Sequence, residues 1–260
     1  MRLSACIEML FVDEVPKFAD RIRAAATAGA SAVEFWTWRD KDLDAIDGAL
    51  SETGLRLASF VSEPAGRLVD PTTHDTFLAG LEDSLKVAQR FGTERLIVLS
   101  GDALPDRPRD EQREALIAVL REAARSAEHA GVALCLEPLN TRHDHPGYFL
   151  EHTDEGLDVI RAVRSDGVKL LYDLYHSVMM GEEPEAVLSA GLDLVGHVHI
   201  ADAPGRNEPG TGTIDWPRRL GWLRASGYEG YLGLEFRPIG RSAATISKVQ
   251  DLVSTNSPAA

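Results

Sequence analysis

The chain has 260 residues, of which 44% are hydrophobic and 26% are charged, so it can bury one large core or two smaller ones. Its formal net charge of −14 disfavours nucleic acid and other acidic partners. The sequence shows neither an N-terminal leader pattern nor a run of about 20 apolar residues, which predicts a cytoplasmic protein without a membrane span.

Short apolar runs alternate with longer amphipathic stretches along the whole chain. This alternation is typical of repeated strand-helix units with a parallel sheet. Eight runs qualify as strands, near residues 3–7, 32–35, 55–61, 95–99, 132–136, 168–172, 194–200 and 231–234. Without a linker or composition break between them, they predict an α/β fold, a closed (β/α)8 TIM barrel forming one domain over 1–260. The last residues, 254–260, are expected to form a loose tail.

Helical periodicity fills the stretches between these runs. Apolar residues recur three and four apart before Gly29, and again before Gly131, at Leu116, Val119, Leu120 and Ala123. Asp70, Thr153 and Asp215 stand where helices are expected to begin. No dinucleotide fingerprint or phosphate-binding loop precedes any of them.

The two cysteines, Cys6 and Cys135, each lie inside an apolar run. A free buried thiol is the commoner state for such a residue than a disulfide. The cysteines therefore fit a reducing compartment.

Four successive predicted strands deliver a side chain that can bind a metal at or near their ends: Glu137, Asp173, His199 and Glu235. In a (β/α)8 barrel the active site is built at the C-terminal ends of the strands. Three carboxylates and one imidazole suit a hard divalent cation, so the pattern predicts about one Mg²⁺ or Mn²⁺ per chain.

Several neighbouring residues have two interpretations. His197 precedes His199 on the same face of its strand and is expected deeper in the barrel, as a core histidine or one that supports a ligand. His176, three residues after Asp173, is either a substrate-binding residue or a solvated loop histidine. Arg206, in the glycine-rich stretch 205–216, either pairs with substrate or is an exposed loop arginine.

Further polar and aromatic residues follow other strands. Trp36 and Trp38 either wall the pocket or cover helix packing. Glu34 and Glu63 have no assigned role. Asp144, in the loop after Glu137, is the candidate for ordering substrate in that segment.

Six motifs in the chain resemble those of one family: LEPLN at 136–140, DHPG at 144–147, YDLYH at 172–176, GHVHIAD at 196–202, EPGTG at 208–212 and LEFRP at 234–238. They are similar to motifs of hydroxypyruvate isomerases, which belong to the xylose isomerase-like TIM barrels. The resemblance begins at CIEMLF, residues 6–11, and is most specific in the second half.

The resemblance implies that Glu137 and Glu235 are the catalytic acid-base pair. Asp173 and His199 would complete the metal site, with His176 and Arg206 near substrate. Two departures bear on the substrate. Hydroxypyruvate isomerases tend to have glutamine where His199 stands, whereas the ketose epimerases have histidine. The segment SFVSEPAGRLVDP, 59–71, is also shorter than usual.

These residues suit isomerisation of a small sugar or hydroxy-oxo acid. Two carboxylates can remove and return a proton, while a divalent cation stabilises the enediolate. The resemblance leaves a ketose 3-epimerase and an inosose dehydratase-type lyase as alternatives with the same metal set. An endonuclease-type hydrolase is disfavoured by the charge of −14 and by the single clear histidine ligand. The oligomeric state is left open, a homo-oligomer being one option.

Overall fold

The computed structural model describes residues 1–255, in which strands and helices alternate. In that part of the chain the strands are β1 (Arg2–Cys6), β2 (Ala32–Glu34), β3 (Arg56–Val61), β4 (Arg95–Leu99), β5 (Ala133–Glu137), β6 (Val168–Asp173), β7 (Val195–Ile200) and β8 (Tyr231–Leu234). They follow one another in chain order as a closed barrel. The predicted (β/α)8 fold is confirmed, and each predicted strand boundary lies within one residue of the observed one.

The helices lie where the amphipathic stretches predicted them. They are α1 (Phe18–Thr27), α2 (Leu43–Thr53), α3 (His74–Phe91), α4 (Arg109–Ala130), α5 (Thr153–Val163), α6 (Leu174–Met179), α7 (Pro184–Leu188), α8 (Trp216–Ala225) and α9 (Ser242–Thr255), with 3₁₀ turns η1 (Pro71–Thr73) and η2 (Leu192–Leu194). Asp215 caps α8 by accepting the Arg218 N–H at 3.2 Å. Asp70 caps η1, which leads directly into α3.

By their contacts the residues form two compact units. The terminal unit comprises Met1–Ala58 and Val198–Ala260, described as far as Thr255, and the central unit comprises Ser59–His197. In the terminal unit β1 pairs in parallel with β2 and β8, and β7 pairs with β8. In the central unit β3, β4, β5 and β6 pair in parallel in that order. That 1–260 form a single domain stays a prediction.

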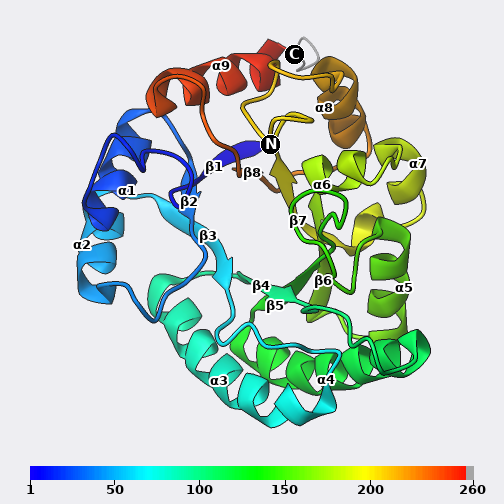
Figure 1. Ribbon diagram of the computed structural model, residues 1–260. Helices are drawn as coiled ribbons and strands as arrows, with labels where there is room; N and C mark the ends of the chain where they lie inside the picture. Colours follow the sequence, from blue (N-terminus) through cyan, green and yellow to red (C-terminus); the bar gives the residue numbers. More distant parts are fainter. Residues whose placement is uncertain (256–260) are drawn as a thin grey trace. The chain divides into compact units, whose positions relative to one another are not determined.

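Within each unit neighbouring helices pack against one another. In the terminal unit α1 packs against α2 and α9, and in the central unit α4 packs against α3 and α5 (Figure 1). The apolar residues of α4 that the sequence singled out, Leu116, Val119, Leu120 and Ala123, are all buried. Burying one large aliphatic side chain stabilises a fold by about 1.5–3 kcal/mol, so such faces fix the helices on the strands.

The strands of the central unit also carry an apolar cluster of their own, formed by Val61, Ile97, Cys135 and Leu171. Each of these residues comes from a different strand of the unit, β3 to β6. Cys6 and Cys135 are both free and buried, as predicted. The cluster packs the strands behind their C-terminal ends and so supports the side chains there.

Helix α9 includes Ser254 and Thr255, where the sequence predicted the start of a loose tail, and 256–260 lie outside the described residues. Over residues 1–255, no helix combines the length and apolar character that crossing a membrane requires.

Candidate active site

In the central unit, two predicted ligands are the last residues of adjacent strands. Glu137 ends β5 and Asp173 ends β6, and both side chains are buried. The Asp173 carboxylate accepts the His176 N–H at 3.1 Å, which caps α6 and sets His176 one turn into that helix. Ligand atoms of Glu137, Asp173 and His176 lie within 4.8 Å of one another. The two ligands that the sequence predicted at strand ends in this unit, Glu137 and Asp173, therefore lie close together.

The amide of Asn140 determines where the proton of a neutral His176 lies. Its oxygen accepts the backbone N–H groups of His143 and Asp144 at 3.0 and 3.1 Å, so the orientation of the amide is fixed. Its nitrogen and the Asn140 backbone N–H both approach His176 Nδ1, at 2.6 and 3.2 Å. Nδ1 must accept from these donors, which leaves the proton of the neutral ring on Nε2. In this tautomer the Nε2–H of His176 can donate a hydrogen bond.

Asp144 accepts hydrogen bonds from two residues that contact His176. Its carboxylate accepts from the Asn140 amide at 2.6 Å and from the Tyr175 hydroxyl at 2.8 Å. Both donors adjoin His176, because Asn140 contacts Nδ1 and the Tyr175 ring lies 5.2 Å from the imidazole, centroid to centroid. These contacts relate Asp144 to the orientation of His176. That Asp144 itself binds substrate stays a prediction.

In the terminal unit, Glu235 follows β8 and is the centre of a polar cluster. One carboxylate oxygen accepts the Trp36 indole N–H at 2.8 Å, and the other pairs with Arg206 at 2.6 Å and lies 3.5 Å from His199 Nδ1. Burial raises the pKa of Glu235, but the charges of His199 and Arg206 and the bond from Trp36 outweigh it and hold the pKa well below its usual range. Glu235 is an anion at neutral pH.

Arg206 reaches Glu235 because its loop is held by a buried carboxylate, Asp202. That side chain accepts N–H groups from Ala203, Gly210, Thr211, Ile214 and the Trp216 indole, at 2.7 to 3.2 Å. The loop folds so closely that a Cβ on Gly212 would lie 2.1 Å from the Ala203 carbonyl oxygen. The Arg206 side chain is only 20% exposed, which is less than expected of a free loop arginine.

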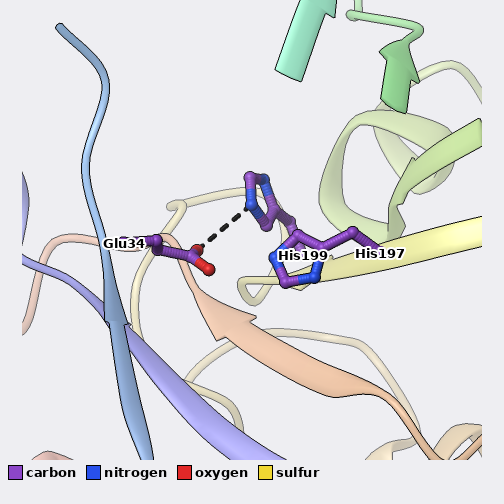
Figure 2. Close-up of side chains that lie close together, drawn as sticks. All are labelled: Glu34, His197 and His199. Carbon is purple, nitrogen blue, oxygen red and sulfur yellow. Dashed lines mark ion pairs between the residues drawn. The ribbon is translucent and has the colours of Figure 1, made fainter. Parts of the chain in front are cut away.

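His199 contacts a carboxylate to which the sequence assigned no role. Its Nε2 lies 3.1 Å from an oxygen of Glu34, which ends β2, and both side chains are buried. Figure 2 shows this ion pair, with His197 two residues earlier on β7. His197 is fully buried, as expected of a core or supporting histidine.

The donor atoms fit a hard divalent cation. Carboxylate oxygens of Glu137 and Asp173 in the central unit, and Glu235 with His199 in the terminal unit, are the ligand types that Mg²⁺ and Mn²⁺ take. Cys6 is not suited to join them: burial first, and then the charges of Glu235 and Glu34, raise the pKa of its thiol. A protonated thiol is a poor ligand.

Sequence reasoning missed three contributors. Glu34 carried the same strand-end signal as the chosen ligands but was left without a role. Trp36 was expected to wall a pocket or cover helix packing. Its hydrogen bond to Glu235 became visible only in the fold, because the two residues are far apart in the sequence. Asn140 gave no signal, because its role depends on the loop that turns its amide toward His176.

Comparison with known proteins decides the family. The model of the xylose isomerase-like TIM barrel family matches residues 22–251. The chain belongs to this family. A 2-oxo-tetronate isomerase of Cupriavidus necator is 30% identical over 94% of this chain and 95% of its own. A putative hydroxypyruvate isomerase of Xenopus laevis is 33% identical over 92% of this chain and 91% of its own.

A solved structure extends the family likeness to three dimensions. The crystal structure titled AP endonuclease, family 2, from Brucella melitensis superposes with a TM-score of 0.90 at 29% identity, covering 96% of this chain and 99% of that one. The similarity in fold therefore extends over nearly the whole of both chains.

Proposed function

We propose that this chain is a metal-dependent isomerase of a small hydroxy-oxo acid or sugar, of the hydroxypyruvate isomerase type. The isomerase relatives, matched over more than nine tenths of their length, support the reaction class. Both relatives carry names of oxo-acid isomerases, which favours a short acid substrate. The net charge of −14 supports a small-molecule substrate over nucleic acid.

The observation that carries the proposal is the environment of Glu235. The carboxylate is buried, ionised and held by Arg206 and Trp36, so it is positioned to take up a proton from substrate. When a substrate carboxylate pairs with Arg206, Glu235 loses one of the partners that lower its pKa and becomes a stronger base. Binding of an acid would thus activate the residue that reacts with it.

Glu137 is the second carboxylate of the proposed reaction. Glu137 and Glu235 each lie at the C-terminal end of a strand, which is where (β/α)8 barrels build their active sites, so we assign them as the acid-base pair. One removes the proton from the hydroxyl-bearing carbon and the other returns a proton to the neighbouring carbon. His176, with its proton on Nε2, donates a hydrogen bond to a substrate oxygen.

The metal ligands of the proposal are Glu137, Asp173, His199 and Glu235. A divalent cation, Mg²⁺ or Mn²⁺ by ligand type, would supply positive charge that lowers the energy of the enediolate by several kcal/mol. Asp173 would hold the ion through one oxygen, since the other caps α6. His176 and Arg206 remain the groups for substrate.

Isotope exchange tests the proposal. Enzyme supplied with Mn²⁺ in D₂O should place deuterium at the reacting carbon of hydroxypyruvate or a 2-oxo-tetronate. Glu235→Gln should lower turnover by more than the roughly 10²- to 10⁴-fold typical of a general base, because a ligand is lost with it. Turnover without solvent deuterium would contradict proton transfer through these carboxylates.

A ketose 3-epimerase is the second candidate. His199 favours it, since the ketose epimerases have histidine at the position where hydroxypyruvate isomerases tend to have glutamine. Such an enzyme would convert a neutral ketohexose, and Arg206→Ala would change its KM little, whereas an acid isomerase would lose substrate affinity in that variant. Conversion of neither substrate, with water released from an inosose, would identify the lyase alternative.

A further inference from the structure

Glu34, which the proposed reaction does not use, forms a buried pair with His199. Glu34 ends β2, and its Oε1 lies 3.1 Å from His199 Nε2. Each side chain is only 2% exposed, so water does not compete for the contact. A carboxylate buried to this degree is costly unless it is paired, so the contact with His199 stabilises the charge of Glu34.

The backbone of β8 leaves the space for this pair. Gly233 is in register with His199 on the neighbouring strand β7. A Cβ on Gly233 would lie 2.3 Å from Glu34 Oε1 and 2.5 Å from His199 Cδ2. Any other residue there would displace one or both side chains, so the sequence of β8 is matched to the contact.

The two nitrogens of His199 face different carboxylates at different distances. Nε2 is within hydrogen-bonding distance of Glu34, whereas Nδ1 lies 3.5 Å from Glu235 Oε2. With the Nε2 side of the ring paired to the Glu34 carboxylate, a cation on the side of Glu235 can take the Nδ1 lone pair. The ring is therefore held with one defined nitrogen on the side of the proposed metal ligand.

We propose that Glu34 is a positioning residue that holds His199 so that Nδ1, not Nε2, serves as the metal-binding atom. The proposal rests on the proposed function, which makes His199 a ligand. A carboxylate on the outer nitrogen of a ligand histidine fixes its orientation and raises the basicity of the other nitrogen. Glu34 acts through His199 and needs no contact with substrate.

Metal affinity provides the first test. Metal-free protein is titrated with Mn²⁺ by calorimetry for the wild type, Glu34→Gln and Glu34→Met. Glutamine keeps an oxygen that can accept from Nε2–H but lacks the charge, while methionine lacks both. We expect an about 10- to 100-fold weaker affinity for Glu34→Met and a smaller loss for Glu34→Gln. Glu14→Gln, a carboxylate of the same unit bonded to Ser242, is the control and should bind as the wild type does.

Nitrogen NMR of the imidazole reports directly which ring nitrogen of His199 carries the proton. A general loss of stability in a variant would not change this signal. In protein loaded with diamagnetic Mg²⁺, the signals of His199 are identified by their absence in His199→Gln. We expect the proton on Nε2 and a metal-shifted Nδ1 without a proton. In Glu34→Met the Nε2 proton should exchange rapidly with solvent. A proton on Nδ1 in the loaded wild type would overturn the proposal.

Asp173→Asn separates failure of this inference from failure of the proposed function. If Asp173→Asn weakens Mn²⁺ binding and Glu34→Met does not, Glu34 is no positioning residue while the metal site stands. If neither variant affects binding, the metal-dependent function itself is wrong. Two ions per chain in the wild type and one in Glu34→Met, by elemental analysis, would show that Glu34 and His199 hold a cation of their own, which also overturns the proposal.

Discussion

At the scale of single residues, the hydrogen bond from Asn140 to His176 yields the first prediction. In Asn140→Asp, an oxygen replaces the nitrogen that donates to Nδ1. The neutral imidazole would then carry its proton on Nδ1, where it bonds to the new carboxylate, and would lose the Nε2–H donor. Loss of a hydrogen bond to a polar substrate group costs about 1.5–3 kcal/mol when charge is involved, so kcat/KM should fall about 10- to 100-fold.

Kinetics and thermal unfolding together check this prediction. Asn140→Ala is the companion variant, because it removes the donor without adding a charge beside Asp144, and it should lose less activity than Asn140→Asp. Both variants should unfold as cooperative proteins. A kcat/KM equal to that of the wild type in Asn140→Asp would show that catalysis does not depend on the Nε2 proton of His176.

The contrast between Asn140 and Asp173 shows what single residues reveal before the fold is known. That Glu137 and Asp173 lie at the ends of adjacent strands could be predicted, because four successive apolar runs each carry a ligand-type side chain at or near their ends. Asn140 follows the same run, but its role depends on two loop N–H groups that turn its amide, and no periodicity encodes such a turn. Glu34 lies at the end of β2, but its partner His199 is far away in the sequence, so only the fold shows their contact.

At the scale of structural elements, Asp202 decides whether the loop that carries Arg206 keeps its shape. Its carboxylate accepts five N–H groups, so in Asp202→Asn the new amide hydrogens would face donors. We expect a loss of at least about 2 kcal/mol of unfolding free energy, because buried donors lose their acceptor. Activity should fall further than stability accounts for, since Arg206 loses its support.

Urea denaturation and kinetics well below the unfolding transition measure the two effects. Asp215→Asn is the matched control, because asparagine caps a helix about as well as aspartate, and α8 should keep its first turn. Equal behaviour of the two variants would contradict the role given to Asp202.

A second element-scale prediction concerns the junction between the segment after β1 and the start of α9. Glu14 accepts the Ser242 N–H at 2.8 Å, and the Ser242 hydroxyl in turn accepts the Phe11 N–H. The bonds to Ser242, followed by the charge of Arg241, lower the pKa of Glu14 below its ordinary 4.5. Because the folded pKa is the lower one, Glu14 stabilises the fold fully above pH 4.5 and loses this effect as the pH falls through the lowered value.

Glu14→Gln should therefore be less stable than the wild type at neutral pH, and the difference should shrink on acidification. Free energies of unfolding from urea titrations over a pH series measure it. Glu82→Gln, an exposed position on α3, reports the general effect of removing one negative charge from an acidic chain. A difference that grows toward low pH would contradict the assigned direction of the shift.

The positions of the strands could be predicted more accurately than the short helices and their caps. The strands were located within one residue because buried parallel strands are near-continuous apolar runs. Helix α6 escaped because six residues span less than two turns and show no apolar period. Asp70 was expected to open a helix and instead caps the 3₁₀ turn η1, since the same side-chain bond serves both kinds of helix.

At the scale of the whole molecule, the metal predicted from four strands should act on the stability of the entire fold. An ion that binds only the folded chain stabilises it by about 2.7 kcal/mol at one hundred times its dissociation constant. In a chain of this size 1 kcal/mol shifts Tm by about 2–4 °C, so Mg²⁺ or Mn²⁺ should raise Tm by about 5–10 °C, reversed by a chelator.

Asp173→Asn should remove most of this shift while leaving the metal-free Tm nearly unchanged. The asparagine oxygen can still accept the His176 N–H and cap α6, so the variant loses charge at the metal and little of the fold. Asp166→Asn, fully exposed in the same unit, is the matched control and should keep the wild-type shift. Differential scanning calorimetry with and without Mn²⁺ measures both. A full shift in Asp173→Asn would show that the ion binds elsewhere in the chain, and the strand-end site would then be wrong.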